Sequence, residues 1–277
     1  MEGLRLARLP DDAIRAIPGW ELERPAPERQ WMVQGALPQS TVCMLSGDGG
    51  IGKSLVAQQL CTAAVMGRPW LGMPTQRGAA LMFSCEDDHL ELHRRHHSIL
   101  EHMGLEHADL DHALHLVDRV GCENGLAERI RYSTRMQPTA LAKRLLQYCL
   151  QHGIRYVVID TATQCFGDGN QNDEISVVSF VNILRRIAIA IAGVVLLTKH
   201  PSVTGRANGS GESGSTAWSN SVRSRLYFRE EANEGGTVLS GMKSNYSRKL
   251  EKLKLRWSKG VFVVDEPEPV DRWYDDR

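Results

Sequence analysis

The chain has 277 residues, of which 42% are hydrophobic and 24% charged, as in an ordinary globular protein long enough to bury a core. Lys and Arg together number 33, and so do Asp and Glu, which gives a formal net charge of zero. This balance excludes a protein that coats nucleic acid by overall charge. Any contact with DNA or RNA must come from a local basic patch or from a ring around the strand.

The amino-terminal sequence and the cysteines indicate a cytoplasmic protein. The first twenty residues carry acids and prolines but no long apolar core, so they are not a secretory signal. No stretch approaches eighteen uncharged apolar residues, so we expect no membrane span. The six cysteines form no C-x-x-C pair, which suits a reducing compartment and argues against a disulfide framework or a structural zinc.

In chain order, an extended proline-rich arm comes first, with one short helix expected near residues 11–16. Apolar runs bounded by turn residues then predict buried strands, at 41–46, 78–84, 112–118, 154–160 and 193–200. Apolar residues at helical spacing predict helices between them, at 52–67, 86–104, 138–153 and 173–193. Residues 119–135 have no clear pattern and are expected to form a loop. Alternation of apolar strands with helices predicts a parallel sheet covered on both faces.

The pattern changes after residue 200. Residues 201–215 are rich in Gly and Ser and predict a flexible loop. Four strand-like runs follow with little helix, at 224–230, 236–243, 252–258 and 260–265. They predict an antiparallel extension of the same sheet. We therefore expect an arm over residues 1–30 that contacts another subunit, one domain over 31–265, and an acidic flexible tail over 266–277.

The octapeptide GDGGIGKS at 47–54 lies between a predicted strand and a predicted helix, which is the context of the phosphate-binding motif G-x-x-x-x-G-K-[ST]. Glycines let backbone N–H groups surround phosphates, and the helix points its positive end at the same anion. In such a loop, Lys53 reaches the β- and γ-phosphates and the Ser54 hydroxyl binds Mg²⁺. The sequence therefore predicts an ATP and Mg²⁺ site, made by Gly47, Asp48, Gly49, Gly50, Ile51, Gly52, Lys53, Ser54 and Leu55.

Polar residues at the ends of three predicted strands complete this site. Asp160 ends the run 154–160, where an aspartate that holds Mg²⁺ is expected, although it could instead cap the next loop. Glu86 follows the run 78–84, where a carboxylate can polarise the attacking water. Helix capping is the alternative for Glu86, and Asp87 is its competitor. His200 ends the run 193–200 and could sense the γ-phosphate or be purely structural.

The segments that carry these residues resemble the RepA-type plasmid replicative helicases and related RecA-like ATPases of plasmids and phages. The resemblance covers roughly residues 30–260. It rests on GDGGIGKS, SCEDD, YVVIDTAT, LLTKH followed by the Gly/Ser loop, SGSTAWSNSVRSRLYF and KSNY. It implies an α/β RecA-like P-loop fold, with a mostly parallel sheet, helices on both faces and an antiparallel carboxyl-terminal extension.

The resemblance also implies roles for particular residues. Asp160 matches the Walker B aspartate, Glu86 the general base and His200 the sensor histidine. Arg223 matches an arginine finger that acts on a neighbouring subunit, with Lys243 as its companion. Arg225 remains a rival to Arg223, because either arginine could simply pair with a carboxylate.

The expected function is an ATP-driven ring, a hexameric homo-oligomer that moves on single-stranded DNA. A RecA-like ATPase that acts in recombination, repair or loading without unwinding is the alternative, and a P-loop kinase is a weaker one. Arg206 in the loop 201–215, with Lys199 just before it, is the expected contact to the strand. The loop 161–172 is a second candidate, and a plain surface loop is the alternative.

Two other groups of residues are assigned no chemistry. His93 and His97 stand at i and i+4 on a predicted helix, but Arg94 and Arg95 between them would repel a cation. Trp218 and Trp257 could stack on bases, yet a role in the core or in a subunit contact is the better interpretation.

Overall fold

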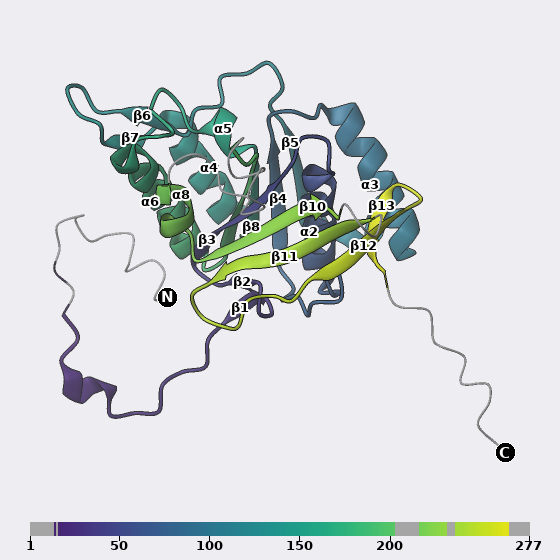
Figure 1. The fold of residues 1–277 in the computed structure, drawn as a ribbon, viewed down its shortest axis with the longest axis horizontal. Coiled ribbons are helices and arrows are strands. Elements are labelled where there is room, and N and C mark those ends of the chain that lie inside the picture. The colour runs from purple at the N-terminus through teal and green to yellow at the C-terminus, as the bar shows by residue number, and fades with distance from the viewer. Residues whose placement is uncertain (1–13, 15, 203–215, 232–235, 266–277) are drawn as a thin grey trace.

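The computed structural model describes residues 14, 16–202, 216–231 and 236–265 (Figure 1). A nine-stranded sheet forms its centre, in the order β13-β12-β11-β10-β3-β9-β8-β4-β5. In chain order its strands are β3 (Thr41–Gly47), β4 (Ala79–Ser84), β5 (Leu114–Asp118), β8 (Ile154–Asp160), β9 (Val194–Lys199), β10 (Ser224–Glu230), β11 (Thr237–Ser244), β12 (Leu253–Ser258) and β13 (Val261–Val264).

Six neighbouring strands of this sheet, from β10 to β5, are parallel, and β11 to β13 are antiparallel. The four inner strands β3, β4, β8 and β9 are buried over nearly their whole length, as continuous apolar runs require when both faces are covered. The prediction of a mostly parallel sheet with an antiparallel extension is confirmed. The extension begins one strand later than expected, because β10 pairs with β3 in parallel.

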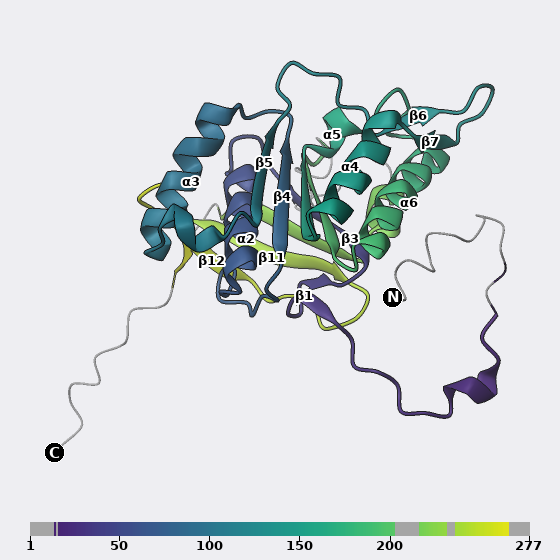
Figure 2. The same ribbon diagram turned by 180° about the vertical axis from the view of Figure 1, so that it is seen from behind.

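Helices cover both faces of the sheet (Figures 1 and 2). One hydrophobic core lies between the sheet and the pair α2 and α3, and a second lies between the sheet and α4, α5, α6 and α8. The helices are α2 (Lys53–Met66), α3 (His89–Met103), α4 (Ala140–Gln151), α5 (Ala162–Cys165), α6 (Glu174–Ala190) and α8 (Thr216–Ser221), with 3-10 turns η1 (Gly19–Leu22) and η2 (His107–Leu110). The four long helices agree with the predicted ones to within a few residues at each end.

Helix α3 begins three residues later than the predicted start at residue 86, and its N-cap explains why. The side chain of Asp88 accepts a hydrogen bond from the backbone N–H of Glu91, so Asp88 is the N-cap and α3 begins at His89. Glu86 and Asp87 therefore stand outside the helix, at the carboxyl edge of the sheet.

Two segments are more ordered than the sequence suggested. β1 (Trp31–Val33) and β2 (Leu37–Pro38) form a small antiparallel pair, and Met32, Val33 and Leu37 are fully buried. Residues 119–135, expected as a loop, contain β6 (Ala127–Arg129), which pairs with β7 (Met136–Pro138). That expectation was wrong because such short strands carry too few residues for a periodic signal.

Some predicted features fall outside the described residues, namely most of the short helix near 11–16, the loop 203–215 and the tail 266–277. Of the arm, residues 16–30 are exposed throughout. Among the described residues, no helix is long and apolar enough to cross a membrane.

Candidate nucleotide-binding site

The octapeptide 47–54 forms the turn that joins β3 to α2, as predicted. Gly50 and Gly52 have φ values of 74° and 99°, a region that residues with a Cβ rarely adopt. A Cβ at Gly52 would also collide with the Phe262 ring. The N-terminus of α2 has no side-chain cap, so its first backbone N–H groups face the turn. Such a turn with an uncapped helix end is a ready anion site.

Lys53 lies at the centre of the site. It is 5% exposed, and its Nζ donates a hydrogen bond to the backbone oxygen of Asp48 at 2.7 Å. Burial lowers the pKa of Lys53, and the carboxylates of Asp160, Glu86 and Asp48 act in the opposite direction. Ile51 and Leu55 are buried in the core beneath the turn, so they can offer only their backbone to a phosphate.

His200 also faces this turn. Its Nδ1 lies 3.3 Å from Lys53 Nζ, and a Cβ on Gly49 would stand 4.0 Å from its Cε1. Partial burial and the nearby Lys53 lower the pKa of His200, so the neutral imidazole predominates at neutral pH. Since the Lys53 ammonium can only donate, Nδ1 is the acceptor of this pair, and the Nε2–H of the neutral ring can donate a hydrogen bond to a γ-phosphate oxygen.

Asp160 ends β8 next to the turn and is fully buried. Its Oδ1 accepts a hydrogen bond from the Thr198 hydroxyl, and its Oδ2 has no hydrogen-bond partner within the described residues. Burial raises the pKa of Asp160, while the hydrogen bond from Thr198 and the nearby Ser54 hydroxyl lower it. Thr198 was missed by sequence reasoning, although a hydroxyl in the apolar run VVLLTK was a usable signal.

These residues fit a bound Mg²⁺. Hard divalent cations prefer oxygen ligands, and Mg²⁺ is commonly held by one or two protein oxygens together with phosphates and water. The Ser54 hydroxyl and the buried Oδ2 of Asp160 are such oxygens at the mouth of the phosphate turn.

Three consecutive acids follow β4, and the structure gives them different surroundings. Asp87 is held by Arg95, which reaches both carboxylate oxygens, and Asp88 caps α3. Glu86 is exposed, and its Oε1 lies 3.4 Å from both the Thr161 hydroxyl and the Gln164 amide. Glu86 is therefore the acid whose side chain the fold leaves at the site, which favours it over Asp87 as the base.

Lys199 ends β9, as predicted, but its side chain does not face outward as a contact to DNA would require. Its side chain is 5% exposed, and its Nζ donates a hydrogen bond to Gln171 Oε1 at 2.9 Å and stands 4.3 Å from the Trp218 ring centroid. Burial lowers its pKa to about 8. In this conformation the amine is turned inward and is not presented to a nucleic acid. Arg206, the other predicted contact, lies outside the described residues.

Four cations gather at the opposite end of the sheet. Arg223 and Arg225 stand at the start of β10, Lys243 pairs in register with Arg225, and Arg185 comes from α6. Burial lowers the pKa values of Lys243 and Arg185, and neighbouring cations of the same group lower them further. Lys243 and Arg185 donate hydrogen bonds to backbone oxygens of α8, at Ser219 and Ser221.

This cation group lies far from the phosphate turn of its own chain. Ser224 pairs with Cys43, and Phe228 pairs with Gly47, so Arg223 stands five residues from the level of Gly47. At about 3.3 Å per residue this is roughly 16 Å along the strand, beyond the reach of an arginine side chain. If Arg223 contacts a nucleotide, that nucleotide must belong to another copy.

Trp218 and Trp257, for which a role in the core or in a subunit contact was predicted, differ in burial. Trp218 is buried in the core against Phe166 and Phe180, as predicted. Trp257 is 61% exposed, so it is not a core residue and stays a predicted subunit contact. Among the described residues, no three or more His, Cys, Asp or Glu side chains are grouped closely enough to hold a metal ion by themselves.

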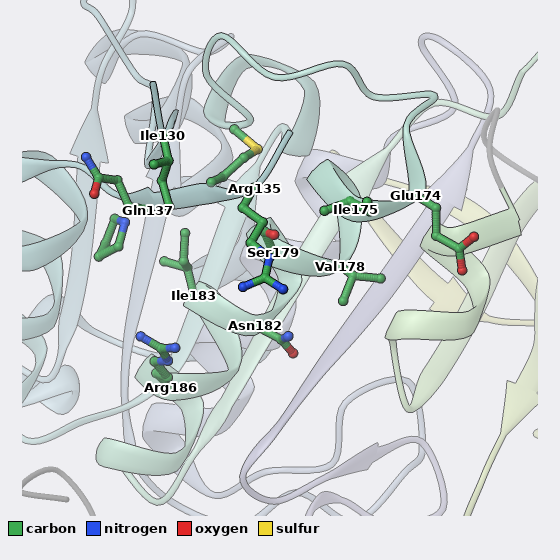
Figure 3. Close-up of a pocket in the computed structure, with 12 residues that line it drawn as sticks. Ile130, Arg135, Gln137, Glu174, Ile175, Val178, Ser179, Asn182, Ile183 and Arg186 are labelled. Carbon is green, nitrogen blue, oxygen red and sulfur yellow. The ribbon is translucent and has the colours of Figure 1, made fainter. Parts of the chain in front are cut away.

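A large hollow lies away from the phosphate turn, between the β6–β7 pair and α6 (Figure 3). Its volume is about 750 Å³. Since its lining includes no residue of the octapeptide, it is not the nucleotide site.

Comparison with known proteins agrees with this geometry. The AAA domain family matches residues 8–206, which is more than two thirds of the chain. The fold is similar to that of a KaiC-like protein from the hyperthermophilic archaeon Pyrococcus horikoshii OT3, with a TM-score of 0.57 and 13% sequence identity. That similarity covers 84% of this chain and 93% of the archaeal chain. No curated protein matches the sequence.

Proposed function

Because the chain belongs to the AAA domain family of P-loop ATPases, we propose that it is a Mg²⁺-dependent ATP hydrolase whose subunits form a ring on single-stranded DNA. The observation that carries the ATPase part is the convergence of Lys53, Asp160, Glu86 and His200 on the phosphate turn. The other two parts of the proposal, the ring and its contact with single-stranded DNA, rest on the position of Arg223 and on the sequence resemblance.

Each residue at the turn has a step to perform. The backbone N–H groups of residues 48–54 hold the phosphates, and Lys53 balances their charge as it builds up on the β–γ bridge. Mg²⁺, when bound, supplies further positive charge there and orients the phosphates. Glu86 accepts a proton from the attacking water, since its carboxylate is exposed and lies within reach of Thr161 and Gln164. His200 contacts the γ-phosphate and Lys53 together, so loss of that phosphate changes the environment of His200.

In this proposal, Arg223 of a neighbouring subunit supplies a further positive charge to the phosphates at each site. The strand register places Arg223 too far from its own nucleotide, and its cation group contains Lys243, Arg225 and Arg185. A ring that sets this group against the next phosphate turn gives each site an arginine in trans, a contact worth several orders of magnitude in turnover in related chemistry.

The test is hydrolysis of Mg-ATP with and without a single-stranded oligonucleotide, combined with displacement of a labelled strand from a forked duplex. We expect basal turnover, stimulation by the oligonucleotide, and ATP-dependent displacement. Stimulation without displacement would favour the loading or recombination ATPase. Transfer of phosphate to an acceptor other than water would favour the kinase. Absence of ATP hydrolysis in the folded protein would refute the proposal.

A further inference from the structure

The β6–β7 pair carries a short tip, residues 129–135, in which positive charge is concentrated. Its sequence RIRYSTR contains three arginines and no acid, although the whole chain has equal numbers of acidic and basic residues. Arg129, Arg131 and Arg135 are all exposed. In a protein of zero net charge, a polyanion can be held only where basic side chains are gathered locally in this way.

Tyr132 lies where the chain reverses within this tip. The backbone N–H of Ser133 donates to the Ile130 oxygen at 3.0 Å, and the Ile130 N–H donates to the Arg135 oxygen at 2.9 Å. This turn gives Tyr132 a φ of 61°, a conformation that Gly or Asn adopts more readily than an aromatic residue. Tyr132 is nevertheless 93% exposed, and the Arg131 guanidinium lies 5.0 Å from the centre of its ring. Neither the turn nor the core therefore requires the aromatic ring.

Exposed arginines beside an exposed aromatic ring are typical of surfaces that bind single-stranded nucleic acid. Guanidinium groups bind phosphates, and an aromatic ring stacks on a base that is not paired in a duplex. An acidic peptide would also pair with the arginines, but it gives no reason for an aromatic ring on a turn that Asn would form more easily. The two features together favour a single strand of nucleic acid.

The hollow beside the tip extends this surface. Ile130 and Arg135 of the tip and Arg186 of α6 are among the residues that line it (Figure 3). Glu174, the one acid of the lining, lies apart from both arginines (Figure 3). A strand with one base stacked on Tyr132 can therefore place the next phosphates along Arg135 and into the hollow.

The β6–β7 pair is bound to the segment that follows Asp160. The backbone N–H of Leu126 donates to the Cys165 oxygen at 2.8 Å, and the backbone N–H of Arg129 donates to Asp168 Oδ1 at 2.7 Å. The base of the tip is thus held by residues that come directly after the strand of the nucleotide site.

The same segment contacts the general base. Helix α5 ends at Cys165 and carries Gln164, whose amide lies 3.4 Å from Glu86 Oε1. A movement of the β6–β7 pair is therefore transmitted through one backbone hydrogen bond and α5 to Glu86. This contact gives a strand bound at the tip a physical route to the rate of ATP hydrolysis.

We propose that the tip 129–135, with Tyr132 at its point, binds single-stranded DNA and that the bound strand acts on Glu86 through α5. This surface is separate from the contacts expected from the sequence, namely Arg206, Lys199 and the loop 161–172. The inference rests on the proposed function for the choice of DNA as the strand.

Binding of a fluorescent oligothymidylate to the full-length protein, measured by anisotropy without nucleotide, tests the surface. Tyr132→Asn removes the ring but suits the left-handed turn, so the fold is kept. The arginine variant combines Arg129→Gln, Arg131→Gln and Arg135→Gln. Its matched control removes three exposed cations on α3 and at β12, by Arg94→Gln, Lys252→Gln and Arg256→Gln. Thermal unfolding shows that each variant is folded.

The two tip variants should weaken binding in different ways. Three phosphate contacts to a single strand contribute about 2 to the slope of log affinity against log salt, which is about a hundredfold in affinity at about 0.1 M salt relative to 1 M. The arginine variant should lose this slope and this affinity, and the control should stay within about threefold of the unmodified protein. Tyr132→Asn should bind roughly fivefold to a hundredfold more weakly with an unchanged slope, as loss of one base stack does.

An abasic oligonucleotide of equal length separates stacking from charge. The unmodified protein should prefer the strand that carries bases, and Tyr132→Asn should lose this preference. Unchanged binding in both tip variants, or equal weakening in the control, would overturn the inference. Competition by polyglutamate as strong as that by the oligonucleotide, at equal concentration of charge, would assign the surface to an acidic protein and would also overturn it.

The link to Glu86 is measured as the ratio of ATP turnover with and without the oligonucleotide. At a concentration that saturates the unmodified protein, this ratio should fall toward one in the arginine variant. A normal ratio in both tip variants would disprove the link. If the unmodified protein does not hydrolyse ATP, the ATPase proposal fails, while anisotropy without nucleotide still decides whether the tip binds the strand.

Discussion

Replacement of Glu86 by Gln separates the chemistry of the site from its structure. Gln has the size of Glu and keeps an oxygen that can accept from Thr161 and Gln164, but it cannot take a proton from water. Both contacts are 3.4 Å long and the side chain is exposed, so the free energy of unfolding should change by no more than about 0.5 kcal/mol. Loss of a general base lowers turnover by about 10² to 10⁴-fold, so we expect binding without hydrolysis.

Asp87→Asn is the matched control, one residue away. The Asp87 carboxylate forms a bidentate ion pair with Arg95, so Asp87→Asn should lower the free energy of unfolding by about 1–3 kcal/mol. Turnover of the folded fraction should stay within a few fold of the unmodified protein. The assay combines steady-state phosphate release, binding of a fluorescent ATP analogue and thermal unfolding. Normal turnover in Glu86→Gln, or turnover lost in a folded Asp87→Asn that still binds ATP, would refute the assignment.

Three further predictions concern Lys53 of the phosphate turn and two buried basic groups, His96 and Lys199. Lys53→Ala should abolish turnover, and normal hydrolysis in that variant would disprove the ATPase site. Burial lowers the pKa of His96 to about 4, so the unfolded chain takes up a proton first, and stability should fall by about 2–3 kcal/mol as pH drops from about 6.5 to 4. This loss should be absent in His96→Gln, as measured by urea unfolding across that pH range. Lys199 has its pKa lowered to about 8, so its contribution to stability should rise between pH 8 and 10.5, and the difference between the unmodified protein and Lys199→Met should show that rise.

The part of the site that lies within short stretches of sequence was accessible without a structure. The octapeptide 47–54 carries its own signal in glycines that need positive φ values, and Asp160 follows an uninterrupted apolar run. Strands β3, β4, β8 and β9 were predicted for the same reason, since burial on both faces leaves continuous apolar runs. At these residues, the sequence pattern of a short segment is enough to predict the conformation and the burial found in the structure.

The parts that depend on distant contacts could not be predicted. Glu86 and Asp87 are chemically alike. Only the contact between Asp87 and Arg95, a residue of α3, shows that Asp87 is the one already held in an ion pair. Lys199 was expected at the surface, but Trp218 and Gln171, which come from two other segments, hold it inside. The short β6–β7 pair is specified by its packing on α6 and not by its own periodicity.

Mixing of two inactive variants tests most directly whether one subunit completes the site of the next. Lys53→Ala removes the charge at a chain's own phosphate turn, and Arg223→Ala removes the cation that we assign to the neighbour's nucleotide. A ring that contains both has some junctions at which an intact turn faces an intact Arg223. We predict that ATP turnover, absent in each variant alone, reappears in mixtures and is greatest near equal amounts. Absence of turnover at every ratio, in assemblies shown by native mass spectrometry to contain both chains, would contradict catalysis by Arg223 in trans.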